Sequence, residues 1–176
     1  MRKILSAALI VYIVALLSTL LIPTLLATTP TYVSGGLAYA PAVVGSRWAD
    51  GNLFLETTEE GWWYDAGGNL IGYSWDAPCR VVVHNANGLP ATDWDFRWYT
   101  AIATFEYFIV DGKSGGLVMR LHGTQGEPGT DWFGQWVIIS GTEDLANLRG
   151  QGTWGGPGFQ GVPSITIHYE GWIHFD

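Results

Sequence analysis

Most of the chain alternates between apolar and polar residues in short runs that end at glycine, proline, asparagine or aspartate. Aromatic and β-branched residues dominate these runs, and a period of two is what a strand with one buried face requires. Helical periodicity is nearly absent after residue 27. The alternation predicts strands at residues 52–64, 70–75, 79–84, 94–110, 116–123, 132–140, 150–154 and 164–175.

About eight successive strands with short connections predict an all-β fold, an antiparallel barrel of about eight strands that is closed or nearly closed, because closure removes exposed strand edges. A two-sheet sandwich is the alternative. In an up-and-down barrel the connections at 65–69, 85–93, 123–131 and 155–163 share one end, which is then the expected ligand mouth. Its candidate ligand-binding residues are Asp65, His84, Asn87, Asp93 and Asp131.

A second polar cluster follows from the hairpin around residues 111–115. Placing Val110 opposite Gly116 sets Glu106 across from Arg120, with His122 on the same face. Facing inward, these three residues are candidate catalytic groups. Facing outward, they form a surface ion pair worth less than ~1 kcal/mol. The alternating aromatic residues on the other face of the strand favour the outward orientation.

The last predicted strand carries a third polar pattern. His168, Glu170, Trp172 and His174 alternate and therefore project from one face. Two histidines and a carboxylate at this spacing are candidate metal ligands. The alternative is the outer polar face of an amphipathic strand, which needs no metal, and no metal site is expected.

The N-terminus predicts export. Residues 1–3 are basic at Arg2 and Lys3, and residues 4–26 are mostly apolar, so residues 1–27 are expected to form a signal peptide or a membrane-anchor helix. Ala38-Tyr-Ala40 resembles a cleavage site, although the proline that follows would hinder cleavage. Residues 28–46 hold no charge and many turn formers, which predicts a linker before a barrel domain at 47–176. The expected location is extracytoplasmic, either secreted or held at the membrane by the uncleaved helix.

Charge and cysteine content limit the classes of partner and the disulfides that the chain can form. The formal net charge is −8, and all 16 acidic residues follow the N-terminal apolar segment, which argues against nucleic acid as a partner. Cys79 is the only cysteine, so no internal disulfide forms. It is expected to be a buried thiol beside Val81 and Val83.

The segment at residues 140–154, SGTEDLANLRGQGTW, breaks the strand pattern. Ser140 and Glu143 have capping-box spacing, which predicts a short helical turn over 142–148. Leu145 and Leu148 share one face of that turn and could close one end of the barrel. The run resembles the G-T-G-(E/D)-L-A-x-L-x-G-x-G hallmark of an uncharacterised family of small β-barrels, which are similar to barrels of the allene oxide cyclase and dirigent type. The resemblance covers roughly residues 100–176, and this chain has Glu143 where that family has glycine.

No nucleophile elbow, P-loop or zinc-binding cysteine cluster occurs, so no cofactor is expected and catalysis has no positive support. We expect a non-catalytic binding or interaction module for a small apolar or aromatic ligand. The family resemblance implies the first alternative, an isomerase or lyase acting on a lipid-like substrate, with Glu106 or His122 as the polar contact. Ten tryptophans supply the second alternative, carbohydrate binding through exposed rings.

Overall fold

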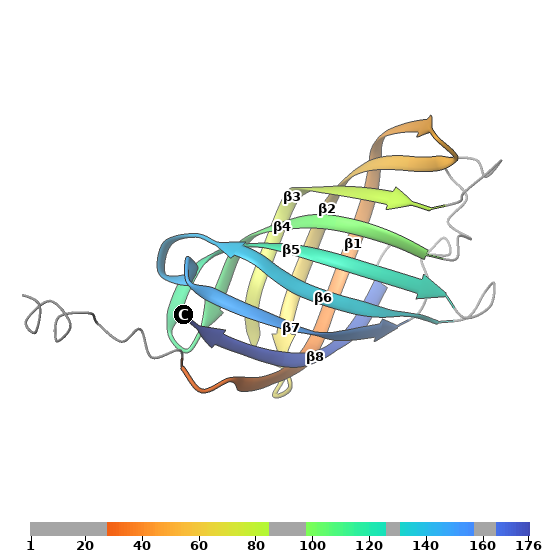
Figure 1. Cartoon of the computed structure of the whole chain (residues 1–176). Helices are drawn as coiled ribbons and strands as arrows, with labels where there is room; N and C mark the ends of the chain where they lie inside the picture. Colours follow the sequence, from red (N-terminus) through yellow and green to blue (C-terminus); the bar gives the residue numbers. More distant parts are fainter. Residues whose placement is uncertain (1–27, 85–97, 126–130, 157–164) are drawn as a thin grey trace, which may run out of the picture.

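The computed structural model describes residues 28–84, 98–125, 131–156 and 165–176, which form eight strands and one short 3-10 helix (Figure 1). The elements are β1 (Thr31–Ala49), β2 (Asn52–Asp65), β3 (Leu70–Val83), β4 (Trp98–Val110), β5 (Lys113–Gln125), β6 (Trp132–Gly141), η1 (Glu143–Leu145), β7 (Leu148–Gly156) and β8 (Ile165–Phe175).

Each strand pairs antiparallel with the next, and β8 pairs antiparallel with β1, so the sheet closes into a ring that we call the barrel. Closure gives every strand a neighbour on both sides, although β1 pairs with β8 only from Thr31 to Tyr39. The prediction of an antiparallel eight-stranded ring is confirmed, and the sandwich alternative is wrong. The expected N-terminal helix at 1–27 lies outside the described residues, and no helix within the described part of the chain has the length and hydropathy to cross a membrane.

The first strand corrects the predicted domain boundary. Residues 31–49, most of them assigned to a linker, form β1, which pairs with both β2 and β8. The absence of charge in this segment reflects its place in the wall, where Leu37 and Tyr39 are buried in the core. The barrel therefore begins at Thr31 rather than at residue 47.

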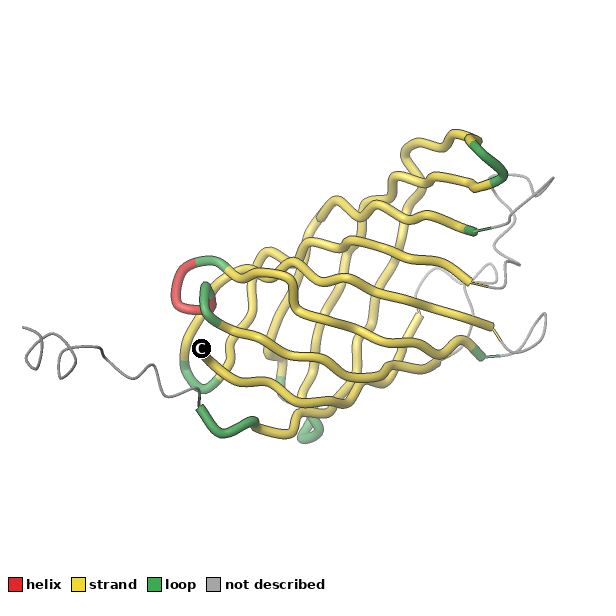
Figure 2. The backbone as a smooth tube through the Cα atoms, in the orientation of Figure 1, coloured by secondary structure: helices red, strands yellow, loops and turns green. Residues whose placement is uncertain are grey.

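The strands at 70–75 and 79–84 are also one element, β3, which bulges at Asp76 instead of turning. Because no turn occurs at residues 76–78, the turn at residues 65–69 lies at the opposite end of the barrel from the connection after β3, and not at the same end as predicted. The turns after β2, β4 and β6 share the end that holds η1, which we call the plug end, and the chain leaves β1, β3, β5 and β7 at the far end (Figure 2).

The β4–β5 hairpin differs from its predicted register. Val110 pairs with Lys113 across a two-residue turn, and a bulge between Phe105 and Phe108 then sets Phe105 opposite Leu117 instead of Leu121. The bulge moves Phe108 into the core and leaves Ile109 39% exposed. A parity argument cannot detect it, since it inserts a residue on one strand only.

The core consists of aromatic rings and aliphatic side chains inside the barrel. Glycines in the wall make room for the rings. A methyl group at Gly152 would lie 2.6 Å from the Trp136 ring, and one at Gly171 would lie 2.5 Å from it. The carbonyl oxygens of Glu170 and Gln151 would lie closer still, so the ring and the neighbouring backbone together require glycine at both positions.

The plug end is closed by η1, as the leucine spacing predicts. Leu145 is fully buried and Leu148, the first residue of β7, is 1% exposed. The predicted helical turn over 142–148 is shorter in the structure, and no side-chain cap forms at its start. The Thr142 hydroxyl instead accepts a hydrogen bond from the Gly116 N–H at 2.8 Å. Glu143 has a φ of 53°, a left-handed conformation that favours the glycine of the resembled family.

We predict that Leu145→Ala lowers the free energy of unfolding by about 2–4 kcal/mol, because it removes a fully buried side chain and leaves a cavity. Denaturant unfolding of the full-length protein measures this. Leu70→Ala is the matched control, since Leu70 is 51% exposed, and its cost should stay below about 1 kcal/mol. Equal costs for the two variants would contradict the assignment of η1 as a plug.

Removal of residues 1–40, the product of cleavage after Ala40, should abolish cooperative unfolding. It deletes every residue of β1 that pairs with β8, from Thr31 to Tyr39. Removal of residues 1–27 should preserve the transition, because it keeps Thr28, which bonds to the Phe175 backbone and is the first of the described residues to contact the barrel. Circular dichroism during thermal unfolding distinguishes the two, and a cooperative transition in the shorter chain would show that the ring closes without β1.

Candidate functional site

A cavity of about 50 Å³ lies in the middle of the barrel, and all eight strands contribute to its lining. Its wall is apolar except for a polar patch on one side. The patch is made of residues from β1 to β4, namely Tyr39, Thr57, Glu59, Cys79 and Tyr99. Polar side chains enclosed by an apolar wall are the usual form of a small-molecule site.

Glu59 is the centre of the polar patch. Burial raises the pKa of its carboxyl from 4.5 to about 7, and a hydrogen bond with the Cys79 side chain lowers this pKa in part. The residue has an intermediate exposure and lines the cavity. Burial and then the nearby Glu59 charge raise the pKa of Cys79 well above its usual value. At neutral pH the pair is therefore a neutral thiol beside a carboxyl that is poised between its two protonation states.

Two irregularities in strand pairing lie close to Glu59 and belong to its local structure. β1 shifts register between Val43 and Gly45, and β2 shifts against β3 between Glu59 and Gly61. In the second shift Ser74 faces Gly61, and its hydroxyl donates to the Glu59 carbonyl at 3.4 Å. Bulges re-aim side chains and often lie next to functional sites.

The tyrosines of the patch are held neutral. Burial raises the pKa of Tyr39 and of Tyr99 well above 10, and each tyrosine also feels the charge of Glu59. Phenols in this state are able to donate a hydrogen bond to a ligand. The patch therefore combines a titratable carboxyl with neutral hydroxyl and thiol groups.

Two buried indole N–H groups border the same space. The Nε1 atoms of Trp63 and Trp154 have no hydrogen-bond partner among the residues that the structure describes, and both side chains line the cavity. A buried donor without an acceptor costs roughly 1–3 kcal/mol. The cost would be offset by a ligand or water that offered an acceptor.

A second cavity of about 60 Å³ lies towards the plug end, lined by Leu148 among others. Trp63, Trp136 and Tyr169 line both cavities and so form the wall between them. Trp63 also packs on Phe105 with ring centroids 5.1 Å apart. Movement of these rings would join the two cavities along the barrel axis.

The structure places Glu106, Arg120 and His122 outside the barrel, where all three are exposed. Arg120 pairs with Ile102 and His122 with Thr100, so the predicted pairing of Glu106 with Arg120 is wrong. The reason is the two-residue turn, which pairs Val110 with Lys113, together with the β4 bulge, and both shift the register. The hypothesis that these residues line the interior is therefore wrong, and their outward orientation is confirmed.

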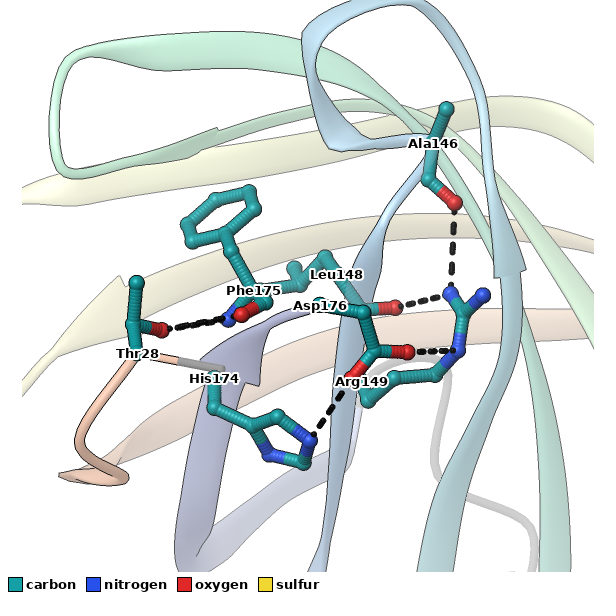
Figure 3. A network of polar contacts seen from close by, with 7 residues as sticks. All are labelled: Thr28, Ala146, Leu148, Arg149, His174, Phe175 and Asp176. Atoms are coloured by element: carbon teal, nitrogen blue, oxygen red, sulfur yellow. Dashed lines mark hydrogen bonds and ion pairs between the residues drawn. The ribbon is translucent and has the colours of Figure 1, made fainter. Parts of the chain in front are cut away.

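His168, Glu170 and His174 also face outward on β8, and the described residues contain no group of three potential metal ligands close together. His174 Nε2 lies 3.2 Å from Asp176, which also contacts Arg149 at 3.1 Å (Figure 3). Glu170 accepts a hydrogen bond from the Tyr32 hydroxyl at 2.7 Å. The outer polar face of an amphipathic strand is the observed arrangement.

The predicted mouth residues do not share one end. Asp65 lies at the plug end, where its carboxylate accepts from the Gly67 and Asn69 backbone N–H groups at 2.8 Å each. Hydrogen bonds from Asn69 lower its pKa, and its role is to hold the β2–β3 turn. His84 lies at the far end, stacked on Trp98 with ring centroids 3.7 Å apart.

Asp131 is exposed beside β6 at the far end as well. Asn87 and Asp93 lie outside the described residues.

Exposed tryptophans are dispersed over the described surface. Trp48, Trp75 and Trp172 lie on β1, β3 and β8. Trp172 pairs with Tyr32, far along β1 from Trp48, and Trp75 lies on β3, so the three residues do not form the row that carbohydrate binding through tryptophan alone would need.

Sequence reasoning missed Glu59. Residues 57–60 are two threonines followed by two glutamates, so each face of β2 receives one residue of each type. This segment by itself therefore does not show which glutamate faces inward. The parity of Leu53, Leu55 and Trp63 is the signal that could have found it, because Glu59 shares it. Burial of Cys79 beside Val81 and Val83 is confirmed.

The structure thus defines a closed antiparallel barrel with a polar patch in an apolar interior. The chain matches no model of a known protein family and no curated protein. The resemblance to small barrels of the allene oxide cyclase and dirigent type therefore stays a prediction.

We predict that Glu59→Gln makes the protein more stable at about pH 8 and has little effect at about pH 4.5. A folded-state pKa above the unfolded one means that the folded state binds the proton more tightly. The stability from Glu59 is therefore complete below about pH 4.5 and is lost as pH rises through about 7. The full difference is on the order of 3 kcal/mol, measured by denaturant unfolding at several pH values.

Glu56→Gln is the control, because Glu56 is exposed on the outer face of the same strand. It should show no such pH-dependent gain. An equal gain in both variants would mean that Glu59 is not desolvated in the folded protein.

Proposed function

We propose that this protein is a non-catalytic binding barrel that takes up a small apolar ligand with one polar group. The observation that carries the proposal is the polar patch around Glu59 inside an otherwise apolar cavity. The apolar part of the ligand would lie against the aromatic wall, and its polar group would contact the carboxyl of Glu59 or the buried indole N–H groups. An exported location, secreted or membrane-anchored, belongs to the same proposal.

The size of the cavity restricts the ligand. A cavity of about 150 Å³ accommodates benzene, and the central cavity here has about 50 Å³. A longer ligand would need the second cavity of about 60 Å³ as well. The shared wall of Trp63, Trp136 and Tyr169 would then have to move, so the apolar tail would extend towards the plug end.

Modification of Cys79 tests the proposal, because it is the only cysteine and it borders the cavity. Short and long straight-chain alcohols and fatty acids serve as probes for the full-length protein. We expect a binding probe to raise the melting temperature and to slow the reaction of Cys79 with methyl methanethiosulfonate by about tenfold or more.

Ala101→Leu should abolish both effects, since Ala101 lines the cavity and a larger side chain fills it. Ala42→Leu is the control, because Ala42 is exposed on β1. The proposal fails if no probe shifts either quantity, or if Ala101→Leu responds as the wild type does.

The Glu59–Cys79 pair favours one second candidate, an isomerase or lyase for a lipid-like substrate. A carboxyl with a pKa of about 7 is suited to giving and taking a proton at neutral pH. Glu59 replaces Glu106 and His122 in this role. Long-chain ketones in heavy water provide the test, because a general base would accelerate deuterium exchange next to the carbonyl. Loss of the acceleration in Glu59→Gln but not in Glu56→Gln would support catalysis, and no acceleration by the wild type would exclude this form of it.

A further inference from the structure

A band of polar side chains runs around the outside of the barrel at one level of the sheet. The strand register sets these residues side by side, because His122 pairs with Gln135, Gln135 with Thr153, Thr153 with Glu170, and Glu170 with Ser34. We call them the polar belt, and its members on β5, β6, β7, β8 and β1 are His122, Gln135, Thr153, Glu170 and Ser34. Strands β5 to β8 lie side by side in Figure 1.

The surface is hollowed on both sides of the belt. One hollow of about 960 Å³ is floored by Gly36 and Gly155, and an adjoining hollow of about 410 Å³ is lined by Gln135 and Gln151. Tyr32, Thr153 and Glu170 line both hollows, so the two are continuous. With strands about 4.8 Å apart, the surface from β6 to β1 spans about 14 Å, which is long enough for an oligosaccharide.

Exposed aromatic rings flank the belt on both sides. Phe133 is 54% exposed on one flank, and Trp172 and Tyr32 are 54% and 50% exposed on the other. Tyr32 and Trp172 pack edge to face with centroids 5.3 Å apart, and the Tyr32 hydroxyl holds one oxygen of the Glu170 carboxylate at 2.7 Å. The rings and the carboxylate are therefore fixed before a ligand arrives, which lowers the entropy cost of binding.

The chemistry of this face fits a neutral sugar. Amides and hydroxyls both donate and accept hydrogen bonds, as sugar hydroxyls do, and the carboxylates of Glu170 and Asp65 accept them. The exposed rings offer flat faces to the C–H side of a pyranose. A polyanion does not fit a chain with a net charge of −8. An apolar protein surface would leave the polar belt without hydrogen-bond partners.

We propose that the outer face of β6, β7, β8 and β1 binds a neutral polysaccharide, independently of the cavity inside the barrel. Glu170 and Gln135 would hydrogen-bond sugar hydroxyls, and the rings of Trp172 and Phe133 would stack on sugar faces. The site differs from a row of exposed tryptophans, because its rings lie on two flanks of a polar belt.

Binding of the full-length protein to insoluble cellulose, chitin, xylan and β-1,3-glucan, and to soluble oligosaccharides of the same four types, tests the proposal. We expect at least one of the four to bind, with affinity unchanged by moderate salt. Trp172→Ala and Gln135→Ala should each weaken that binding about tenfold. Trp75→Ala is the matched control, since Trp75 is 56% exposed on β3 outside this face, and its affinity should equal that of the wild type.

Phe133→Ala, on the opposite flank, gives a second variant if Trp172→Ala proves unstable in thermal unfolding. Absence of binding to all four polysaccharides would overturn the proposal, as would an equal loss in Trp75→Ala. Ala101→Leu, which fills the interior cavity, should leave sugar binding intact, so failure of the apolar-ligand proposal and failure of this one are separate results.

Discussion

The barrel depends on the close contact between aromatic rings inside and glycine backbone in the wall. Trp136 lies against Gly152 and Gly171, and its indole N–H donates to the Thr153 and Glu170 carbonyls at 3.1 and 3.2 Å. A ring that fills the interior in this way needs a neighbour without a side chain. Gly155 on β7 and Gly36 on β1 face outward and give the larger external hollow its floor. The high glycine content therefore shapes both the core and the outer surface.

The interior is filled almost completely, and the central cavity that remains is bordered by the carboxyl of Glu59 and the thiol of Cys79. Burying Glu59 costs stability above about pH 4.5, as its raised pKa shows, and a packed apolar residue would avoid that cost. Groups that lower stability in a cavity are more often retained for function than for folding. Two register shifts close to Glu59 fit the same view, because regular pairing would be simpler for the sheet alone.

The alternation along the chain was enough to predict an antiparallel ring of about eight strands and the burial of Leu145, Leu148 and Cys79. It failed where the period of two is interrupted. The Asp76 bulge made β3 look like two strands, and an uncharged segment with many small residues concealed β1. The two-residue turn after Val110 and the Phe105–Phe108 bulge together shifted the partner of Arg120. These errors share one origin. The pattern of apolar and polar residues along the chain does not show a bulge or a strand rich in small residues, although both change which residues pair across the sheet.

The sequence by itself determined the class of fold, the acidic character and the closure of one end by two leucines, because these follow from local period and composition. Only the tertiary structure decided that Glu59 meets the Cys79 thiol at a cavity, since the two residues lie on different strands and their proximity depends on the pairing of β2 with β3. It also decided that His122 and Glu170, distant in the chain, stand on one outer belt. Register between strands is a property of the closed ring, and no single strand encodes it.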